Sequence, residues 1–178
     1  MQTYCIILAA GNSKRFSSSN KNKLFSNIYG VPLIFFTLTN ILRVFNEDEI
    51  FIVINKDLSK KHQSFLKRFT KNKLIYGGSS RFKSLKNAIR NFNNDVNLLI
   101  HDAARPNIKK DLIKKIKNEI ESVNVYSVIP YTLITDTLKS KKLNTYHNVK
   151  RSQFINTQTP QALKLNKVSR KIILSTRN

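Results

Sequence analysis

The chain has 178 residues, of which 40% are apolar, enough to bury the core of one domain and too few for two. Its 32 Lys and Arg against 10 Asp and Glu give a formal charge of +22, and 10% of its residues are aromatic, more than a charge-expanded disordered chain carries. No apolar run reaches the roughly 18 residues of a membrane helix. The single cysteine excludes a disulfide scaffold and a multi-cysteine zinc site. We therefore expect one folded domain in a reducing cytoplasm.

The first third of the chain alternates between strand and helix patterns. Residues 4–9 are an unbroken apolar run, typical of a strand that is buried on both faces of a parallel sheet. Apolar residues at helical spacing predict a helix over 31–45, with Pro32 suited to its first turn. A second buried strand is expected at 50–54, followed by a helix that Asp57 can cap.

The alternation continues beyond residue 70. Residues 74–76 predict a third strand, which ends at the pair Gly77 and Gly78. Ser79 or Ser80 can then cap a helix with apolar residues at helical spacing.

A fourth strand is expected at 96–100, then a helix opened by Asp111, then a fifth strand at 123–129. Strands and helices that alternate through short connections predict an α/β fold with a Rossmann-like, doubly wound, mostly parallel sheet. Ligands of such sheets bind beyond the carboxyl ends of the strands.

The pattern changes after Pro130. The segments 136–140 and 146–149 favour strands but lack the apolar bulk of a central sheet, so we expect a β-arm that extends from the domain over about 132–159. Residues 162–174 have a weak helical period.

The positive charge indicates either a nucleic-acid interface or a solvated surface. Short basic pairs at 60–61, 109–110, 114–115 and 141–142 are scattered along the chain, which favours the solvated surface. A basic nucleic-acid-binding module remains the alternative from another functional class. A positive field also favours anionic small substrates.

The most distinctive chemistry follows the first strand. Ala9, Ala10 and Gly11 precede the basic pair Lys14 and Arg15, so small residues that let backbone N–H groups approach a triphosphate stand beside cations that can neutralise it. The spacing is neither that of a P-loop nor that of a dinucleotide-binding loop. On spacing alone, an ordinary turn with a solvated cation pair explains the segment equally well.

Further segments make a resemblance specific. They are Ala-Ala-Gly-x-x-x-Arg ending at Arg15, Asn22-Lys23-Leu24-Phe25, Gly30-x-Pro32-Leu33, Gly77-Gly78-x-x-Arg81-x-x-Ser84, His101-Asp102-Ala103-Ala104-Arg105-Pro106, Asp136-Thr137-x-Lys139, and Arg151 followed by Thr159-Pro160-Gln161. In this order the chain, from residue 4 to about 161, resembles the 2-C-methyl-D-erythritol 4-phosphate cytidylyltransferases of non-mevalonate isoprenoid synthesis. The segment 101–106 is the most specific of these.

The resemblance implies a reaction and its residues. CTP and 2-C-methyl-D-erythritol 4-phosphate would give CDP-methylerythritol and pyrophosphate, with Arg15 and Lys23 as catalytic charge stabilisers and Asp102 as the ligand of Mg²⁺. Residues that would hold CTP are Ala9, Ala10, Gly11, Gly78, Ser84 and Ala103. Residues that would position the second substrate are Thr137, Arg151 and Thr159, across a homodimer interface formed by the arm.

Several alternatives stay open. Lys21 lies close to Lys23 and competes with it for the second catalytic position, although Lys23 keeps the following segment in register. Arg81 can anchor a loop or contact the triphosphate, and we expect His101 to be structural. Asp102 can also cap the next helix, but its position after a buried strand favours a metal ligand.

The resemblance stops short of the family's full pattern. After Thr159-Pro160-Gln161 the family continues through an acidic segment, a further strand and an Asn-x-Lys-[Val/Ile]-Thr motif, none of which occurs in this sequence. We therefore expect a single nucleotidyltransferase domain over 1–178 that lacks the C-terminal part of the family domain. A pentitol-phosphate cytidylyltransferase, acting on ribitol 5-phosphate, and an inactive truncated remnant are the alternative functions.

Overall fold

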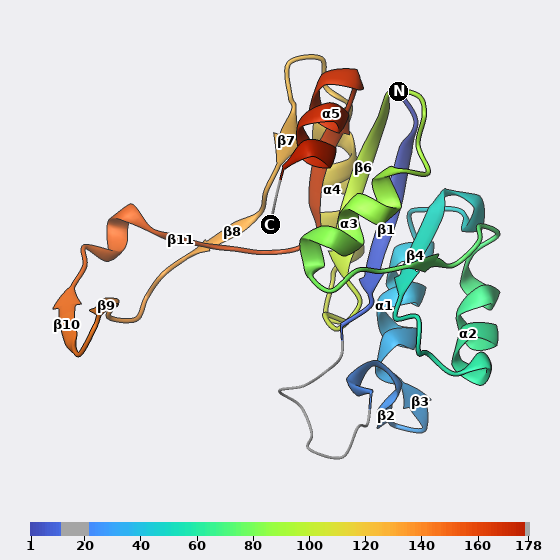
Figure 1. Ribbon diagram of the computed structural model, residues 1–178, viewed down its shortest axis with the longest axis horizontal. Coiled ribbons are helices and arrows are strands. Elements are labelled where there is room, and N and C mark those ends of the chain that lie inside the picture. The colour runs from blue at the N-terminus through green and yellow to red at the C-terminus, as the bar shows by residue number, and fades with distance from the viewer. Residues whose placement is uncertain (12–21, 177–178) are drawn as a thin grey trace.

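The computed structural model describes residues 1–11 and 22–176, and a six-stranded sheet is the centre of this structure (Figure 1). The order of its strands is β5-β4-β1-β6-β12-β7. Four neighbours, β5, β4, β1 and β6, run parallel, and β12 is antiparallel to both β6 and β7. The strands of the sheet are β1 (Thr3–Ala9), β4 (Ile50–Ile54), β5 (Ile75–Tyr76), β6 (Val96–Asp102), β7 (Ser127–Val128) and β12 (Gln161–Leu165).

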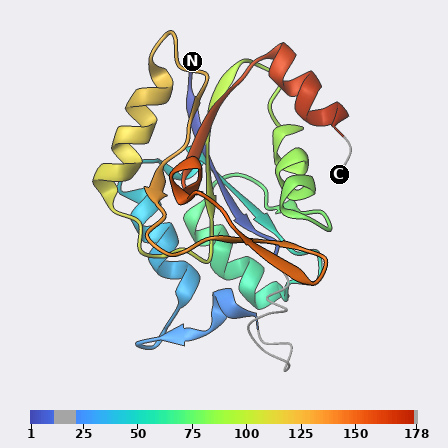
Figure 2. The ribbon, with the colours of Figure 1, turned by 90° about the vertical axis from the view of Figure 1, so that its left-hand side faces the viewer.

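Helices cover both faces of the sheet, as Figure 2 shows with the sheet between them. On one face, α1, α2 and α4 bury apolar side chains against alternate residues of β1 and β4. On the other face, α3 and α5 pack with the remaining alternate residues. The helices are α1 (Leu33–Leu42), α2 (Lys60–Leu66), α3 (Arg81–Ile89), α4 (Lys110–Glu121) and α5 (Lys167–Ser175), with short 3-10 turns η1 (Lys23–Phe25), η2 (Glu47–Glu49), η3 (Lys67–Phe69) and η4 (Arg151–Gln153). The predicted doubly wound α/β fold is confirmed.

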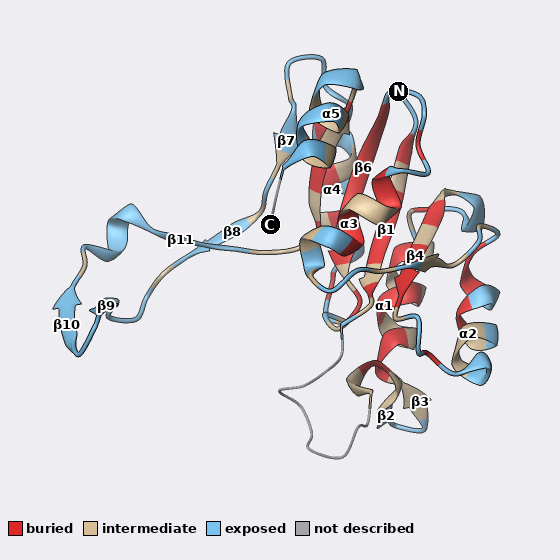
Figure 3. Ribbon diagram, viewed as in Figure 1, coloured by how far each residue is buried: buried red, intermediate tan, exposed pale blue. Residues whose placement is uncertain are grey.

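The core follows from the apolar runs of the central strands. Strands β1, β4 and β6 are buried along most of their length because helices cover both of their faces (Figure 3). None of the helices in the described part of the chain is both long and apolar enough to cross a membrane.

Of three expected helix caps, the structure contradicts two and selects Ser80 of the two serines offered for the third. Ser59, not Asp57, caps α2, since its hydroxyl accepts the N–H of His62. Ser80 caps α3 by accepting the N–H of Lys83. Asp111 lies inside the first turn of α4, and Lys109 occupies the cap without a side-chain hydrogen bond.

Strand β6 is longer than expected. It continues through the last residue before the turn, Asp102, because pairing with β1 extends to the register Leu8 opposite Asp102. The segment from His101 therefore begins inside the sheet, not after it.

The expected fifth strand is wrong in extent. Only Ser127–Val128 is a strand, at the edge of the sheet, because the neighbouring position beside β6 is taken by β12. Residues 161–165, which we expected to belong to a helical segment, are that strand, and the helix α5 begins only at Lys167. Packing decides this: Ala162 and Leu165 are buried against the two faces of the core.

The expected arm is present. Between β7 and β12 the chain leaves the sheet and returns, and the excursion projects away from it (Figure 1). Two antiparallel pairs stiffen it: β8 (Tyr131–Leu133) with β11 (Ile155–Thr157), and β9 (Lys139–Lys142) with β10 (Thr145–Asn148). A smaller pair, β2 (Asn27–Ile28) with β3 (Val31–Pro32), precedes α1.

Cys5 provides a test of the buried sheet. It lies in β1 with no exposed surface, and burial raises the pKa of its thiol well above the ordinary value of 9.0. Because only the thiolate is reactive, we expect the native chain to react with a disulfide reagent only as fast as it unfolds, and within seconds in denaturant. Thiol release measured by absorbance checks this.

The control is a Ser152→Cys variant, which places a second thiol on exposed η4. It should give an immediate burst of one equivalent under native conditions. A burst from the parent chain would contradict the buried position of Cys5.

Candidate active site

The site forms where β1 and β6 end side by side. Leu8 pairs with Asp102 in the sheet, and the N–H of Ala103 donates to the carbonyl of Leu8 over 3.0 Å. After β1 the chain moves to β4 on one side, and β6 lies on the other, so this is a switch point of the sheet. Ligands of open α/β sheets bind in the crevice beyond such a point. The structure therefore brings Ala9 and Ala10 next to Asp102.

The Gly77-Gly78 turn lies against the same corner. A Cβ on Gly77 would approach the Cβ of Ala10 to 2.4 Å and the Oγ of Ser84 to 2.8 Å. Gly77 is thus required for close approach of the β5 turn to the β1 turn. The sequence prediction placed Gly78 at the nucleotide and gave Gly77 no role in the site.

Ser84 shapes this turn from inside α3. The N–H of Gly78 donates to Ser84 Oγ over 3.1 Å, and that hydroxyl donates to the carbonyl of Ser80 over 2.9 Å. Ser84 is buried. Its hydroxyl therefore holds the glycine turn in place, and the N–H of Gly77 is held by the carbonyl of Ile54 over 2.8 Å.

Ala103 is fully buried, and both of its backbone groups are engaged within the fold. Its N–H bonds to Leu8, and its carbonyl accepts the hydroxyl of Thr37 in α1 over 2.8 Å. This alanine therefore fixes the turn after β6 against α1, and its small side chain leaves no bulk between the two strand ends. Gly11, at the other end of the corner, is exposed, and a Cβ there would meet no atom of the described part of the chain within 4 Å.

Asp102 carries the negative charge of the site between two cations. Its Oδ1 accepts from Arg81 Nε at 3.0 Å, and its Oδ2 forms an ion pair with Arg105 Nε at 3.3 Å. The carboxylate is 26% exposed, and each arginine side chain is about half exposed, so the cluster faces the solvent. Two guanidinium groups around one carboxylate leave a net positive surface, which suits a polyphosphate.

His101 supports this cluster from the core. The ring is buried, and its Nε2 lies 3.0 Å from the carbonyl of Arg105, which can only accept, so Nε2 carries the hydrogen. Nδ1 has no hydrogen-bond partner among the described residues. Burial lowers the pKa of His101 below 6.5, which keeps the ring neutral at neutral pH. The expected structural role fits this position.

A magnesium ion fits this site only together with a substrate. Among the described residues, no three His, Cys, Asp or Glu side chains are grouped as a metal site. Each oxygen of Asp102 faces one guanidinium group and keeps a lone pair that a metal ion can use. A hard cation held by a single carboxylate, water and phosphate oxygens matches how Mg²⁺ binds in nucleotide enzymes.

Of the two expected catalytic cations, the structure describes only Lys23. Arg15 lies outside the described residues, and so does Lys21, the alternative to Lys23. Lys23 is the first residue of η1, a turn capped by Asn22, whose Oδ1 accepts the N–H of Leu24 at 3.1 Å. The cap fixes the backbone from which the Lys23 side chain extends.

The three expected substrate residues belong to the arm. Thr137 and Arg151 lie in its projecting part, away from the strand ends, and Arg151 Nη1 donates to the carbonyl of Thr135 over 2.6 Å. Thr159 lies at the base of the arm, and its hydroxyl is buried with no hydrogen-bond partner in residues 1–11 and 22–176. Within one chain, the structure thus separates Thr137 and Arg151 from the nucleotide corner.

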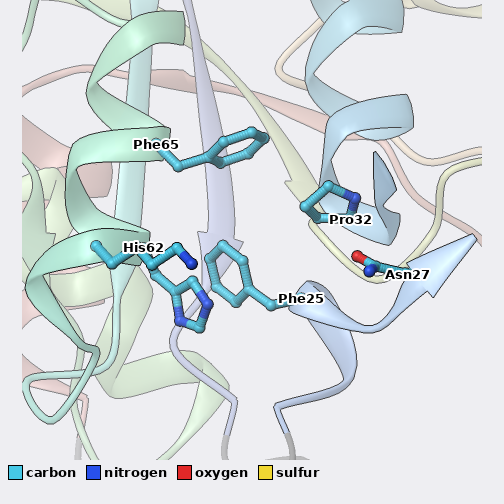
Figure 4. A pocket seen from close by; sticks show the side chains of 6 residues that line it. Phe25, Asn27, Pro32, His62 and Phe65 are labelled. Carbon is cyan, nitrogen blue, oxygen red and sulfur yellow. The ribbon is translucent and has the colours of Figure 1, made fainter. Parts of the chain in front are cut away.

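A pocket of about 350 Å³ lies apart from these residues, between the η1–β3 segment and α2 (Figure 4). Phe25 and His62 stack in it with ring centroids 3.8 Å apart, beside Phe65 and Pro32. Partial burial, helped by neighbouring Lys61, lowers the pKa of His62. No residue predicted for the site lines this pocket.

Two residues of the cluster were missed or left undecided by the sequence. Arg105 was quoted within a motif and given no role, and Arg81 was left between two roles. Gln158, at the base of the arm, was not noticed, although its Oε1 accepts from Arg105 Nη1 at 3.1 Å. Position after the fourth strand signals Arg105, whereas nothing local signals Gln158.

Comparison with known proteins gives a consistent result. The family described as IspD, 2-C-methyl-D-erythritol 4-phosphate cytidylyltransferase, matches residues 3–174. The bifunctional enzyme IspD/IspF of Pelagibacter ubique is 40% identical over 173 residues, which cover 94% of this chain and 44% of that protein. The 2-C-methyl-D-erythritol 4-phosphate cytidylyltransferase of Geobacillus kaustophilus is 33% identical over 93% of this chain and 73% of its own length.

Solved structures give the same match. The bifunctional IspDF of Campylobacter jejuni superposes with a TM-score of 0.77 at 25% identity, covering 99% of this chain and 44% of that one. The 4-diphosphocytidyl-2C-methyl-D-erythritol synthase of Anaerococcus prevotii gives 0.73 at 25% identity, over 98% and 72%. The chain therefore spans less than half the length of the bifunctional relatives and nearly three quarters of the others.

The family match covers almost the whole sequence, and it includes every strand of the six-stranded sheet as well as the arm. The chain belongs to the IspD family of 2-C-methyl-D-erythritol 4-phosphate cytidylyltransferases.

Proposed function

We propose that the chain transfers a cytidylyl group from CTP to 2-C-methyl-D-erythritol 4-phosphate, releasing pyrophosphate. The observation that carries this proposal is the corner where β1, β5 and β6 end. There the backbone of two small-residue turns lies beside a carboxylate held by two arginines. Family membership supports the choice of nucleotide and acceptor.

The nucleotide would lie over the small residues. Ala9, Ala10 and Gly11 follow β1, and Gly78 lies on the turn that Ser84 holds. None of these five side chains extends beyond a hydroxymethyl group, so polar backbone groups can come close to a base, a ribose or a phosphate. Ala103 contributes by keeping the space between the strand ends narrow.

The reaction needs little proton transfer. A phosphate oxygen of the acceptor, already anionic, attacks the α-phosphorus of CTP, and the bond from that phosphorus to the bridging oxygen breaks as pyrophosphate leaves with the electron pair. Placing the two anions in line and neutralising their charge is the main demand on the protein. Lys23 and Arg15 are our candidates for that neutralisation, and the positive surface around Asp102 adds to it.

Asp102 would hold Mg²⁺, which would supply charge neutralisation between triphosphate oxygens when bound. Arg81 and Arg105 orient both oxygens of this carboxylate in the structure. The chain's part is therefore to present a fixed carboxylate toward the nucleotide.

The acceptor would be held by the arm of a second copy of the chain. Thr137 and Arg151 lie in the projecting part of the arm, so a homodimer that exchanges arms is the simplest way to bring them to the strand ends. The arm exposes large apolar side chains, which a second copy would cover. They are Tyr131, Leu133, Leu143, Tyr146, Phe154 and Ile155.

The first test measures pyrophosphate release from CTP and Mg²⁺ with three acceptor conditions: methylerythritol phosphate, ribitol 5-phosphate and none. We expect release only with methylerythritol phosphate. Release with ribitol 5-phosphate alone would transfer the function to the pentitol-phosphate enzyme. Absence of release in all wells, with CTP still stabilising the chain against heat, would identify an inactive remnant.

Lys23 and Lys21 form a matched pair for the second catalytic position. If Lys23 stabilises charge at the α-phosphorus, Lys23→Ala should lower kcat by about 10²–10³-fold, the usual effect of one such contact. The KM for CTP should change less, because the charge acts mainly in the transition state. Steady-state kinetics of both alanine variants decide between them: a larger loss in Lys21→Ala would reverse the assignment.

The shared site is tested by mixing two inactive variants. Asp102→Asn removes the metal ligand, and Arg151→Ala removes an arm contact, so each alone should have little activity. If each site uses Asp102 of one copy and Arg151 of the other, a refolded equal mixture should recover about a quarter of the parent activity, since half the dimers are mixed and each has one intact site.

Circular dichroism and sedimentation of each variant provide the control for folding and dimer formation. Recovery should depend on subunit exchange, so mixing without refolding should restore less. No recovery between two folded, exchanging variants would place both residues in the same copy's site.

A further inference from the structure

The carboxylate at the site is connected to the base of the arm by an ion pair and a hydrogen bond. Asp102 Oδ2 forms the ion pair with Arg105 Nε at 3.3 Å, and Arg105 Nη1 donates to Gln158 Oε1 over 3.1 Å. Arg105 thus uses one edge of its guanidinium for the site and another for the arm. Gln158 stands between β11 and β12, where the chain returns from the arm to the sheet.

Gln158 is itself fixed at both ends. Its backbone N–H donates to the carbonyl of Pro130 over 2.8 Å, which joins the returning segment to the outgoing one. Its Nε2 donates to the carbonyl of Asn156 over 3.3 Å, which orients the amide so that Oε1 faces Arg105. The position of the arm's base therefore determines the position of this acceptor.

Arg105 needs such an acceptor. Its side chain is 49% exposed, so packing alone does not hold the planar guanidinium in one orientation. The ion pair with Asp102 alone leaves rotation about the Cδ–Nε bond and the aliphatic stem, and the hydrogen bond from Nη1 to Gln158 restricts that rotation. Arg81 holds the other oxygen of Asp102 over 3.0 Å.

We propose that Gln158 is a positioning residue which acts through Arg105 on Asp102, so that the seating of the arm sets the orientation of the metal-binding carboxylate. The proposal rests on the proposed function. It assigns to the arm base a role inside its own chain, separate from any contact that the arm makes with a second copy.

The first test observes Arg105 directly and needs no activity. In ¹⁵N-labelled chain, the Nε–Hε signal of Arg105, identified by its loss in Arg105→Lys, should be protected from exchange with water. Gln158→Met keeps the length and removes the acceptor, so exchange at Arg105 should quicken by about fivefold, the factor that corresponds to the loss of one hydrogen bond. Gln158→Glu keeps an acceptor and should restore protection.

The second test measures how Mn²⁺, used as a probe for Mg²⁺, binds in the presence of CTP, by electron paramagnetic resonance of the free ion. Gln158→Met should raise the dissociation constant of Mn²⁺ about tenfold, within the usual range for loss of an outer partner, and Gln158→Glu should not. Gln153→Met, the same change at an exposed glutamine of η4, is the matched control and should leave both measurements unchanged.

The outcomes separate the two proposals. Unchanged exchange at Arg105 in Gln158→Met would overturn the positioning role, whatever the enzyme does. Faster exchange with unchanged Mn²⁺ affinity would also overturn it, because Arg105 would then not act on the carboxylate. Failure of the parent chain to release pyrophosphate, with Gln158 controlling both measurements as described, would count against the reaction and leave the positioning role standing.

Discussion

The parallel pairing of β1 with β6 is the constraint on which the site depends. It sets Leu8 opposite Asp102, so the turn of small residues and the carboxylate leave the sheet at the same level. Both strands are buried under helices on two faces, so neither can slip by one residue without moving its apolar side chains to the wrong side. The packing of the core therefore fixes the relative positions of the small-residue turn and Asp102 at the surface.

The alanines and glycines of this corner have the same origin. Ala10 and Gly77 approach so closely that one Cβ more would cause a clash, and Ala103 is packed without exposed surface under Thr37. Large side chains would separate the strand ends and close the crevice. The positive charge at the edge of this corner comes from longer side chains. Two of them, Arg81 and Arg105, are held in place by Asp102.

The sequence predicted the parts of the fold in which local pattern and burial agree. The strand at 50–54 matches β4, and the helix expected over 31–45 contains α1. In both segments the local apolar pattern and the burial in the core favour the same element. Residues 161–165 failed, since their mixed apolar and polar pattern permits either element, and only the vacant position beside β6 makes them a strand. Asp57 lost its expected cap to Ser59 through a difference of two residues, which local rules do not resolve.

The residues of the site also divide into those that the sequence predicted and those that it missed. Asp102 and the small turns were recognisable because they form a contiguous motif after a buried strand. Gln158 was not, because its partner Arg105 is distant in sequence and meets it only after the arm has returned. The hydrogen bonds within the Gly78 turn show a further limit, since a serine expected to face a ligand can instead hold the loop from below.

The antiparallel strand β12 has a consequence for the order in which the chain is made. It completes the interior of the sheet beside β6, yet it follows the whole arm in sequence. During synthesis from the N-terminus, β6 therefore has an open hydrogen-bonding edge, with apolar residues on both faces, until residue 165 has emerged. In a chain growing at about 5–20 residues per second, that edge stays uncovered for several seconds, during which it can pair with another strand.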